Sequence, residues 1–367
     1  MSYYILPKNN VCLDLNYTIK PCETGVPIYT SFSIYNYYNI IYKQLEKFLL
    51  QLSPEFFFEI FDTMVNEINL GIIKRKINDF HTYEYIYSNV PGMQFSVSKL
   101  KTNSSFFYEF FETLVTLNCF EQFNHPIHFF HMGENYLDSI KCFELLRPGY
   151  DDIILYKNDG EVMDENIEKC EFLFYEMNDT VFDDLNSYIL QMINIVMIII
   201  KSQKENGLSI IKVNQIFHKP IIDILYILSS MFEKIIILKP NVTNSCSFNK
   251  YLVCKSFIYD DHREKIYKEY FHKLYKLRSE FTRNIEIHSI IDSEIPCYFI
   301  NKIDDVNIII GQQQLEHICQ IINIFKNTNK NEKIDLIKKN NIQKSILWCE
   351  KFKIPCNKFL DKTNMFY

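Results

Sequence analysis

Glycine is scarce in this sequence, with 8 in 367 residues, where about 7% is usual. Only glycine lets the backbone adopt a positive φ at no steric cost, so several glycine-rich phosphate loops are not expected. The sequence also contains no Walker loop, no Gly-x-Ser-x-Gly motif and no Cys-x-x-Cys pair. These absences argue against P-loop nucleotidases, serine hydrolases of the α/β type and zinc ribbons.

Excess positive charge and long apolar runs are missing too. Lysine and arginine number 39 against 45 acidic residues, so the net charge of −6 creates no general attraction for nucleic acid. The longest apolar run, 189–200, contains Gln191 and Asn194 and is too short to span a bilayer. We therefore expect a buried helix there and no membrane partner.

Features of secreted proteins are also absent. The first residues lack the apolar segment of a signal peptide, and the 11 cysteines form no regular framework. Reduced thiols and a cytoplasmic location are therefore expected.

Hydrophobic residues make up 47% of the chain and aromatic residues 16%, enough for a sizeable core. Apolar spacing predicts helices at 39–52, 54–72 and 104–117, with Ser104 or Ser105 as the N-cap of the third. Short apolar runs then alternate with helical stretches, which is typical of an α/β sheet. The predicted strands are 126–132, 152–156, 171–175, 208–213, 234–238 and 251–257, and the helices between them are 136–146, 183–204 and 219–232.

The last two predicted strands are joined by a loop too short for a helical crossover. They should form an antiparallel hairpin at the end of an otherwise parallel sheet. Beyond this hairpin the chain is mostly helical in pattern, with charged faces. The sequence therefore predicts a mostly helical segment at 1–95, an α/β domain at 96–258 and a helical extension at 259–367.

The block 207–257 carries the most specific motifs. A strand ends in Ile211-Lys212-Val213, a later strand ends in Lys239-Pro240, and the final strand contains Val253-Cys254-Lys255. This block resembles the C-terminal half of FtsJ-like methyltransferases, especially cap-specific mRNA nucleoside-2′-O-methyltransferases. Further stretches resemble the members of this family in large DNA viruses: 106–117, 130–134, 310–315 and 346–349. The resemblance implies a Rossmann-like sheet, mostly parallel with an antiparallel last hairpin.

The family uses a Lys-Asp-Lys-Glu tetrad, in which the central lysine helps to remove the proton of a ribose 2′-hydroxyl. The resemblance places that catalytic lysine at Lys212 and the aspartate at Glu176. The glutamate position holds the uncharged Asn249, and the first lysine position falls near Glu109, which has the opposite charge. Lys99 or Lys101 could replace that first lysine only if the alignment shifts.

The family's cofactor loop, Glu-Gly-Pro-Gly-Gly-Phe, corresponds here to Glu134-Asn135-Tyr136-Leu137-Asp138-Ser139. Only Gly133 and Glu134 are left as candidate cofactor-binding residues. Side chains of the replacement residues would occupy the space of S-adenosylmethionine, so no cofactor is expected. If the alternative below holds, S-adenosylmethionine is the cofactor. No metal site is expected.

Two functions remain open. The first is a catalytically degenerate methyltransferase-fold protein that binds capped mRNA or viral mRNA-processing proteins within a capping, polyadenylation or transcription apparatus. The alternative is an active cap 2′-O-methyltransferase. In either case Lys212, Lys239 and Lys255 are expected to form one basic RNA-binding cleft. A viral factory or a virion is then a further expected location beside the cytoplasm.

Overall fold

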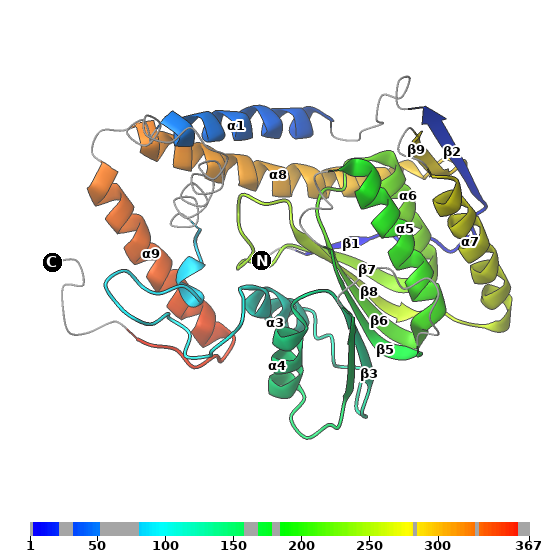
Figure 1. Ribbon diagram of the computed structural model, residues 1–367, viewed down its shortest axis with the longest axis horizontal. Helices are drawn as coiled ribbons and strands as arrows, with labels where there is room; N and C mark the ends of the chain where they lie inside the picture. The colour runs from blue at the N-terminus through cyan, green and yellow to red at the C-terminus, as the bar shows by residue number, and fades with distance from the viewer. Residues whose placement is uncertain are drawn as a thin grey trace, which may run out of the picture. The chain divides into compact units, whose positions relative to one another are not determined.

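The computed structural model describes residues 3–21, 32–51, 81–157, 168–177, 184–281, 285–326 and 330–358. The helix expected at 54–72 lies outside these residues. The chain divides into two compact units, each described here by itself (Figure 1). Unit 1 comprises 1–32, 113–240 and 249–309, and unit 2 comprises 33–112, 241–248 and 310–367.

A seven-stranded mixed sheet forms the centre of unit 1, with the strand order β1-β7-β8-β6-β5-β3-β4. β4, β3, β5 and β6 are mutually parallel, and β8 is inserted antiparallel between β6 and β7. The expected antiparallel hairpin and the α/β fold class are therefore confirmed. The strands are β1 (Tyr3–Leu6), β3 (His128–Met132), β4 (Ile153–Lys157), β5 (Cys170–Glu176), β6 (Gln203–Val213), β7 (Phe232–Leu238) and β8 (Lys250–Phe257).

Helices cover both faces of this sheet. The crossover through α4 (Tyr136–Leu146) leads outward from β3 to β4, whereas α5 (Leu185–Ser202) leads from β5 to β6 in the opposite direction. Because such crossovers are right-handed, the two helices lie on opposite faces, as Figure 1 also shows. α6 (Lys219–Met231) precedes β7 and lies on the α5 side. The sheet is therefore doubly wound, an arrangement that leaves its carboxyl edge open to ligands.

α5 is the one described helix long and apolar enough to cross a membrane by length and composition alone. Most of its residues are buried inside unit 1, including Met192, Val196 and Ile199. Asp184 caps its first turn by accepting hydrogen bonds from the backbone N–H groups of Asn186 and Ser187. The predicted buried helix is thus confirmed.

Three strands were not predicted from the sequence: β1, β2 (Leu15–Pro21) and β9 (Ile285–Ile291). β1 has four residues, too few to establish an alternating pattern, and it pairs with β7. β2 and β9 pair with each other in a separate two-stranded sheet, with irregular register. Each depends on a partner far away in the sequence, which local patterns cannot reveal. α7 (Asp261–Glu280), which precedes β9, is helical as predicted.

Unit 2 is mainly helical. Its core joins α1 (Phe32–Gln51) to the second half of α8 (Cys297–Lys326), through Tyr38, Ile318 and Ile321 among others. α9 (Lys330–Lys351) and the short η2 (Glu84–Ile86) also belong to this unit. α3 (Phe106–Thr116) begins in unit 2, where Ser104 caps it by accepting the Phe106 N–H at 3.2 Å, as predicted.

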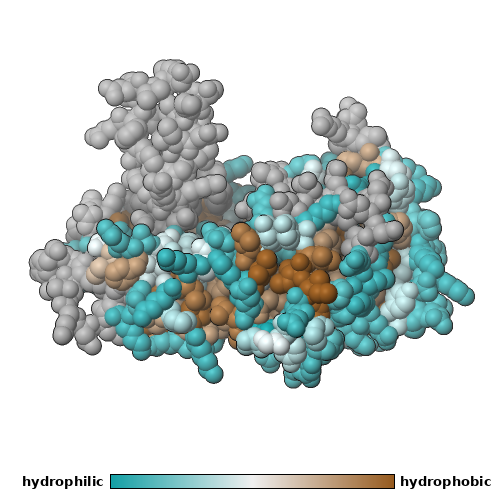
Figure 2. Space-filling view, turned by 60° about the horizontal axis from the view of Figure 1, so that its bottom comes forward, coloured by the Kyte–Doolittle hydropathy of each residue, from teal (hydrophilic) through white to brown (hydrophobic). Residues whose placement is uncertain are grey.

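Some apolar side chains remain at the surface. Figure 2 shows a hydrophobic patch bordered by hydrophilic residues on one face of the molecule. The two edge strands of the large sheet also expose apolar groups: Tyr3 and Ile5 in β1, and Ile153 and Tyr156 in β4. Such exposure at sheet edges often marks an interaction site.

A buried ion pair fixes the approach to β4. The Arg147 guanidinium contacts Asp152 at 2.6 Å, and the two side chains are only 2% and 6% exposed. The same guanidinium donates to the carbonyls of Phe123 and His125 at 2.7 Å each. The end of α4, the entry to β3 and the entry to β4 are therefore held by one side chain.

We predict that Arg147→Met lowers the free energy of unfolding by about 3–5 kcal/mol, because Asp152 is left buried without its counter-ion. Denaturant unfolding of the full chain measures this loss. Lys268→Met is the matched control, since Lys268 pairs with Glu264 at the solvent-exposed surface of α7 and should change little. Equal effects of the two substitutions would contradict a structural role for the buried pair.

Candidate functional site

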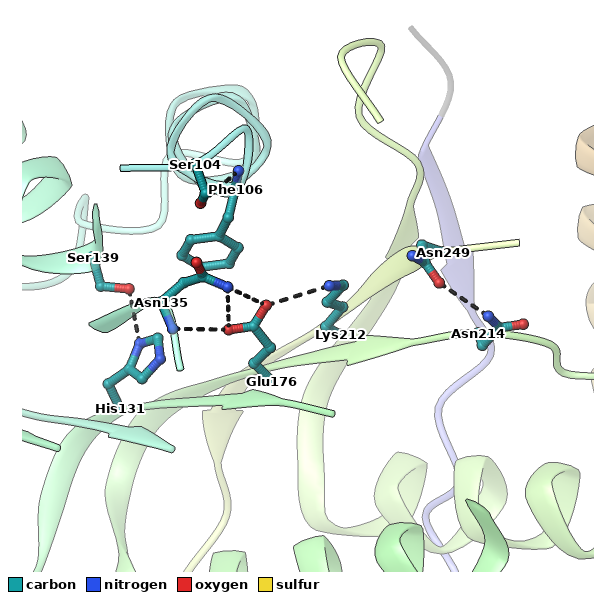
Figure 3. Close-up of polar contacts among 9 residues, drawn as sticks. All are labelled: Ser104, Phe106, His131, Asn135, Ser139, Glu176, Lys212, Asn214 and Asn249. Carbon is teal, nitrogen blue, oxygen red and sulfur yellow. Dashed lines mark hydrogen bonds and ion pairs between the residues drawn. The ribbon is translucent and has the colours of Figure 1, made fainter. Parts of the chain in front are cut away.

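Two predicted site residues meet at the carboxyl edge of the sheet. Glu176 ends β5 and lies opposite Lys212, near the end of the parallel strand β6. The Lys212 ammonium lies 3.3 Å from a carboxylate oxygen of Glu176, and the side chains are 13% and 5% exposed. Parallel pairing aligns the ends of these strands, so the sheet itself produces this contact (Figure 3).

Asn135 approaches the same carboxylate from the other side. Its side-chain amide donates to the two Glu176 oxygens at 2.9 and 3.0 Å, and its backbone N–H donates to one of them at 3.3 Å. The Glu176 carboxylate is therefore bonded by its own chain on both sides (Figure 3). Such bonds replace the water that a buried carboxylate loses.

Gly133 makes this approach sterically feasible. It follows β3 with a φ of +143°, and a Cβ at this position would lie 2.6 Å from the Cβ of Glu176. Its N–H donates to the Lys157 carbonyl at 2.9 Å. Gly133, predicted as a cofactor contact, is therefore required for packing, because Glu176 of β5 leaves no room for a side chain at this position.

His131 anchors the segment that follows β3. One ring nitrogen lies 2.8 Å from the hydroxyl of Ser139 in α4. Burial lowers the pKa of His131 to about 3, so the ring is neutral near pH 7. Because α4 begins directly after Asn135, this contact holds the end of β3 against the first turn of α4, next to the residue that binds Glu176.

A second polar group lies at the same edge, beside β6. The side-chain amide of Asn214 donates to that of Asn249 at 3.0 Å. The next residue, Lys250, is 2% exposed, and its side-chain Nζ donates a hydrogen bond to the Asn214 carbonyl at 2.5 Å. Burial, and secondarily the charge of Lys239, lower the pKa of Lys250 well below its usual range. Sequence reasoning missed Lys250, because nothing in the sequence indicated that this lysine is buried.

The remaining predicted lysines do not all meet. Lys239 directly follows β7 and is half-buried at the carboxyl edge. Lys255 on β8 lies opposite Leu208 on β6, whereas Lys212 lies opposite Tyr251. Four residues separate the two positions, which is about 13 Å along a strand. Its ammonium group donates to the Leu117 carbonyl. The expected single cleft of Lys212, Lys239 and Lys255 is therefore wrong, because β8 runs antiparallel and carries Lys255 to the opposite edge.

Two further predicted site residues are Glu134 and Glu109. Glu134 is exposed beside Gly133. Glu109 lies in the part of α3 that belongs to unit 2, and the alternatives Lys99 and Lys101 precede this helix in the same unit. Glu112 of the same helix was not predicted as a site residue. Burial raises its pKa to about 7, although it accepts the Val242 N–H at 3.2 Å.

The edge therefore offers amide and ammonium donors around one internally bonded carboxylate. In the part of the chain that the structure describes, no three His, Cys, Asp or Glu side chains form a group able to hold a metal ion. The chemistry available to these residues is hydrogen bonding, charge recognition and, through lysine, proton transfer.

No protein-family model matches the sequence, and no curated protein is significantly similar to it. The likeness to FtsJ-like methyltransferases therefore depends on the quoted motifs.

Lys250 should make stability depend on pH. Since its pKa is lowered on folding, the unfolded chain binds more protons, and stability rises with pH from the folded pKa toward about 10.5. We predict that the stability difference between the native protein and Lys250→Met grows by up to about 1.4 kcal/mol per pH unit in favour of the native protein.

Denaturant unfolding at several pH values up to 10 measures this difference. Lys268→Met is the control: Glu264 raises the pKa of Lys268, so the contribution of Lys268 is fully present below about 10.5 and should stay nearly constant over this pH range. A Lys250→Met difference that stays constant with pH would show that Lys250 is not held neutral.

Proposed function

We propose that this protein is a degenerate FtsJ-like methyltransferase that binds RNA without using S-adenosylmethionine. Its place would be a capping, polyadenylation or transcription apparatus of a large DNA virus, in the cytoplasm, a viral factory or the virion. The observation that carries the proposal is the Glu176 network, in which Asn135 and Lys212 hold the carboxylate at the carboxyl edge. Doubly wound sheets bind their ligands at this edge.

The sheet order supports the assignment to this fold group. Four parallel strands are followed by an antiparallel strand placed between β6 and β7. That arrangement is the topology of S-adenosylmethionine-dependent methyltransferases. Topology alone gives no function, so the proposal depends on the residues at the carboxyl edge.

The same residues support loss of the cofactor. The connection from β3 to α4 consists of Gly133, Glu134 and Asn135. Gly133, its one glycine, accommodates Glu176, and Asn135 bonds to that same carboxylate. A cofactor that bound here would have to replace these contacts or fit beside them.

The alternative of an active 2′-O-methyltransferase is favoured by one observation, the Lys212–Glu176 contact. In that reaction S-adenosylmethionine would supply the methyl group, and Lys212 would have to be deprotonated to accept the proton of the ribose 2′-hydroxyl. Methyl transfer to capped RNA that Lys212→Ala abolishes would establish this alternative and overturn the degenerate one.

RNA binding should be local and electrostatic, because the whole chain carries a net charge of −6. We predict that a short capped RNA binds at low salt and that its affinity falls steeply toward physiological salt. Lys239→Ala should weaken binding and reduce the salt slope by about one. Fluorescence anisotropy at several salt concentrations measures both quantities.

Lys234→Ala is the matched control, since Lys234 is exposed and pairs with Lys255 at the opposite edge. It should leave the affinity unchanged. Equal losses for Lys234 and Lys239, or no RNA binding in dilute buffer, would contradict RNA recognition at the carboxyl edge. The second result would favour a role in binding proteins.

A further inference from the structure

β4 is an edge strand with backbone groups directed away from the sheet. Among the described residues it pairs with β3 alone. The Ile153 N–H donates to the carbonyl just before β3, and the Lys157 carbonyl accepts the Gly133 N–H, both at 2.9 Å. Because successive residues of a strand alternate, the backbone N–H and C=O groups of Ile154 and Tyr156 point outward.

The central residues of this edge, among those that the structure describes, lack proline and charge, which commonly block strand pairing. No proline and no charged residue interrupts Ile153–Tyr156, and the side chains of Ile153 and Tyr156 are 48% and 52% exposed. Edge strands are commonly protected by such residues. The opposite edge strand, β1, is followed directly by Pro7, which has no N–H to donate.

We propose that β4 pairs antiparallel with β4 of a second copy of this chain, about a two-fold axis at Ile154. A residue with outward backbone groups can exchange hydrogen bonds with its own counterpart on such an axis. In this register Ile153 lies opposite Leu155 of the second copy, so apolar side chains meet on both sides of the axis.

The charges flanking this apolar segment favour a second copy as the partner. Asp151 is exposed just before β4, and Lys157 ends the strand. With the axis at Ile154, Asp151 of each copy lies opposite Lys157 of the other. Opposite charges directly across two strands stabilise the pairing, and symmetry repeats the contact twice. A shift by two residues would remove both pairs, so charge and backbone direction select the same register.

Sedimentation velocity of the full chain over a range of concentrations tests the proposal. The native protein should form a dimer. Asp151→Lys and Lys157→Asp should each weaken association about tenfold, because like charges then face each other twice. An equimolar mixture of the two variants should restore dimerisation, since every lysine meets an aspartate in the mixed dimer.

Ile154→Pro adds a backbone test. It removes an N–H that points outward, so it should weaken the dimer while circular dichroism stays native. Asp151→Lys combined with Lys157→Asp should dimerise like the native protein, which shows that the exchanged side chains are tolerated. A native protein that remains monomeric at all concentrations would overturn the proposal. So would a dimer that neither charge reversal weakens, or variants whose mixture gains no dimer.

Discussion

The carboxylate of Glu176 joins the ends of three neighbouring strands. Glu176 is the last residue of β5, and its carboxylate binds the ammonium group of Lys212 on β6 and accepts hydrogen bonds from Asn135 just beyond β3. Each contact needs the parallel register that aligns these strand ends. The glycine at 133 is needed because Glu176 lies so close to the backbone there. The local conformation of the β3–α4 connection is therefore coupled to this one side chain.

This coupling bears on function in two ways. A lysine bonded to a carboxylate and largely removed from water is well placed to meet a polar ligand, which is the feature that the active alternative would use. The same carboxylate, however, is already bonded on both sides, so a ligand must compete with contacts inside the chain. A surface for RNA needs only accessible positive charge and donors near this edge, and it does not require the network to open.

The sequence predicted the central sheet well, because the interior strands are continuous apolar runs separated by amphipathic helices. It missed β1, β2 and β9, whose partners lie far away along the chain. It paired Lys212 with Glu176 through a resemblance, and the parallel register explains why the two meet. It placed Lys255 at the same edge as Lys212, although the predicted antiparallel direction of β8 puts a residue near the end of that strand at the opposite edge. Lys250 was overlooked because burial of a lysine depends on tertiary packing, which local sequence does not encode.

Loss of the cofactor is tested most directly by calorimetric titration of the full chain with S-adenosylmethionine. With Asn135 and Lys212 bonded to Glu176, no saturable isotherm should appear up to millimolar cofactor, since losing about 4 kcal/mol turns micromolar binding into millimolar binding. A saturable isotherm with a micromolar dissociation constant would contradict this result and favour an active methyltransferase.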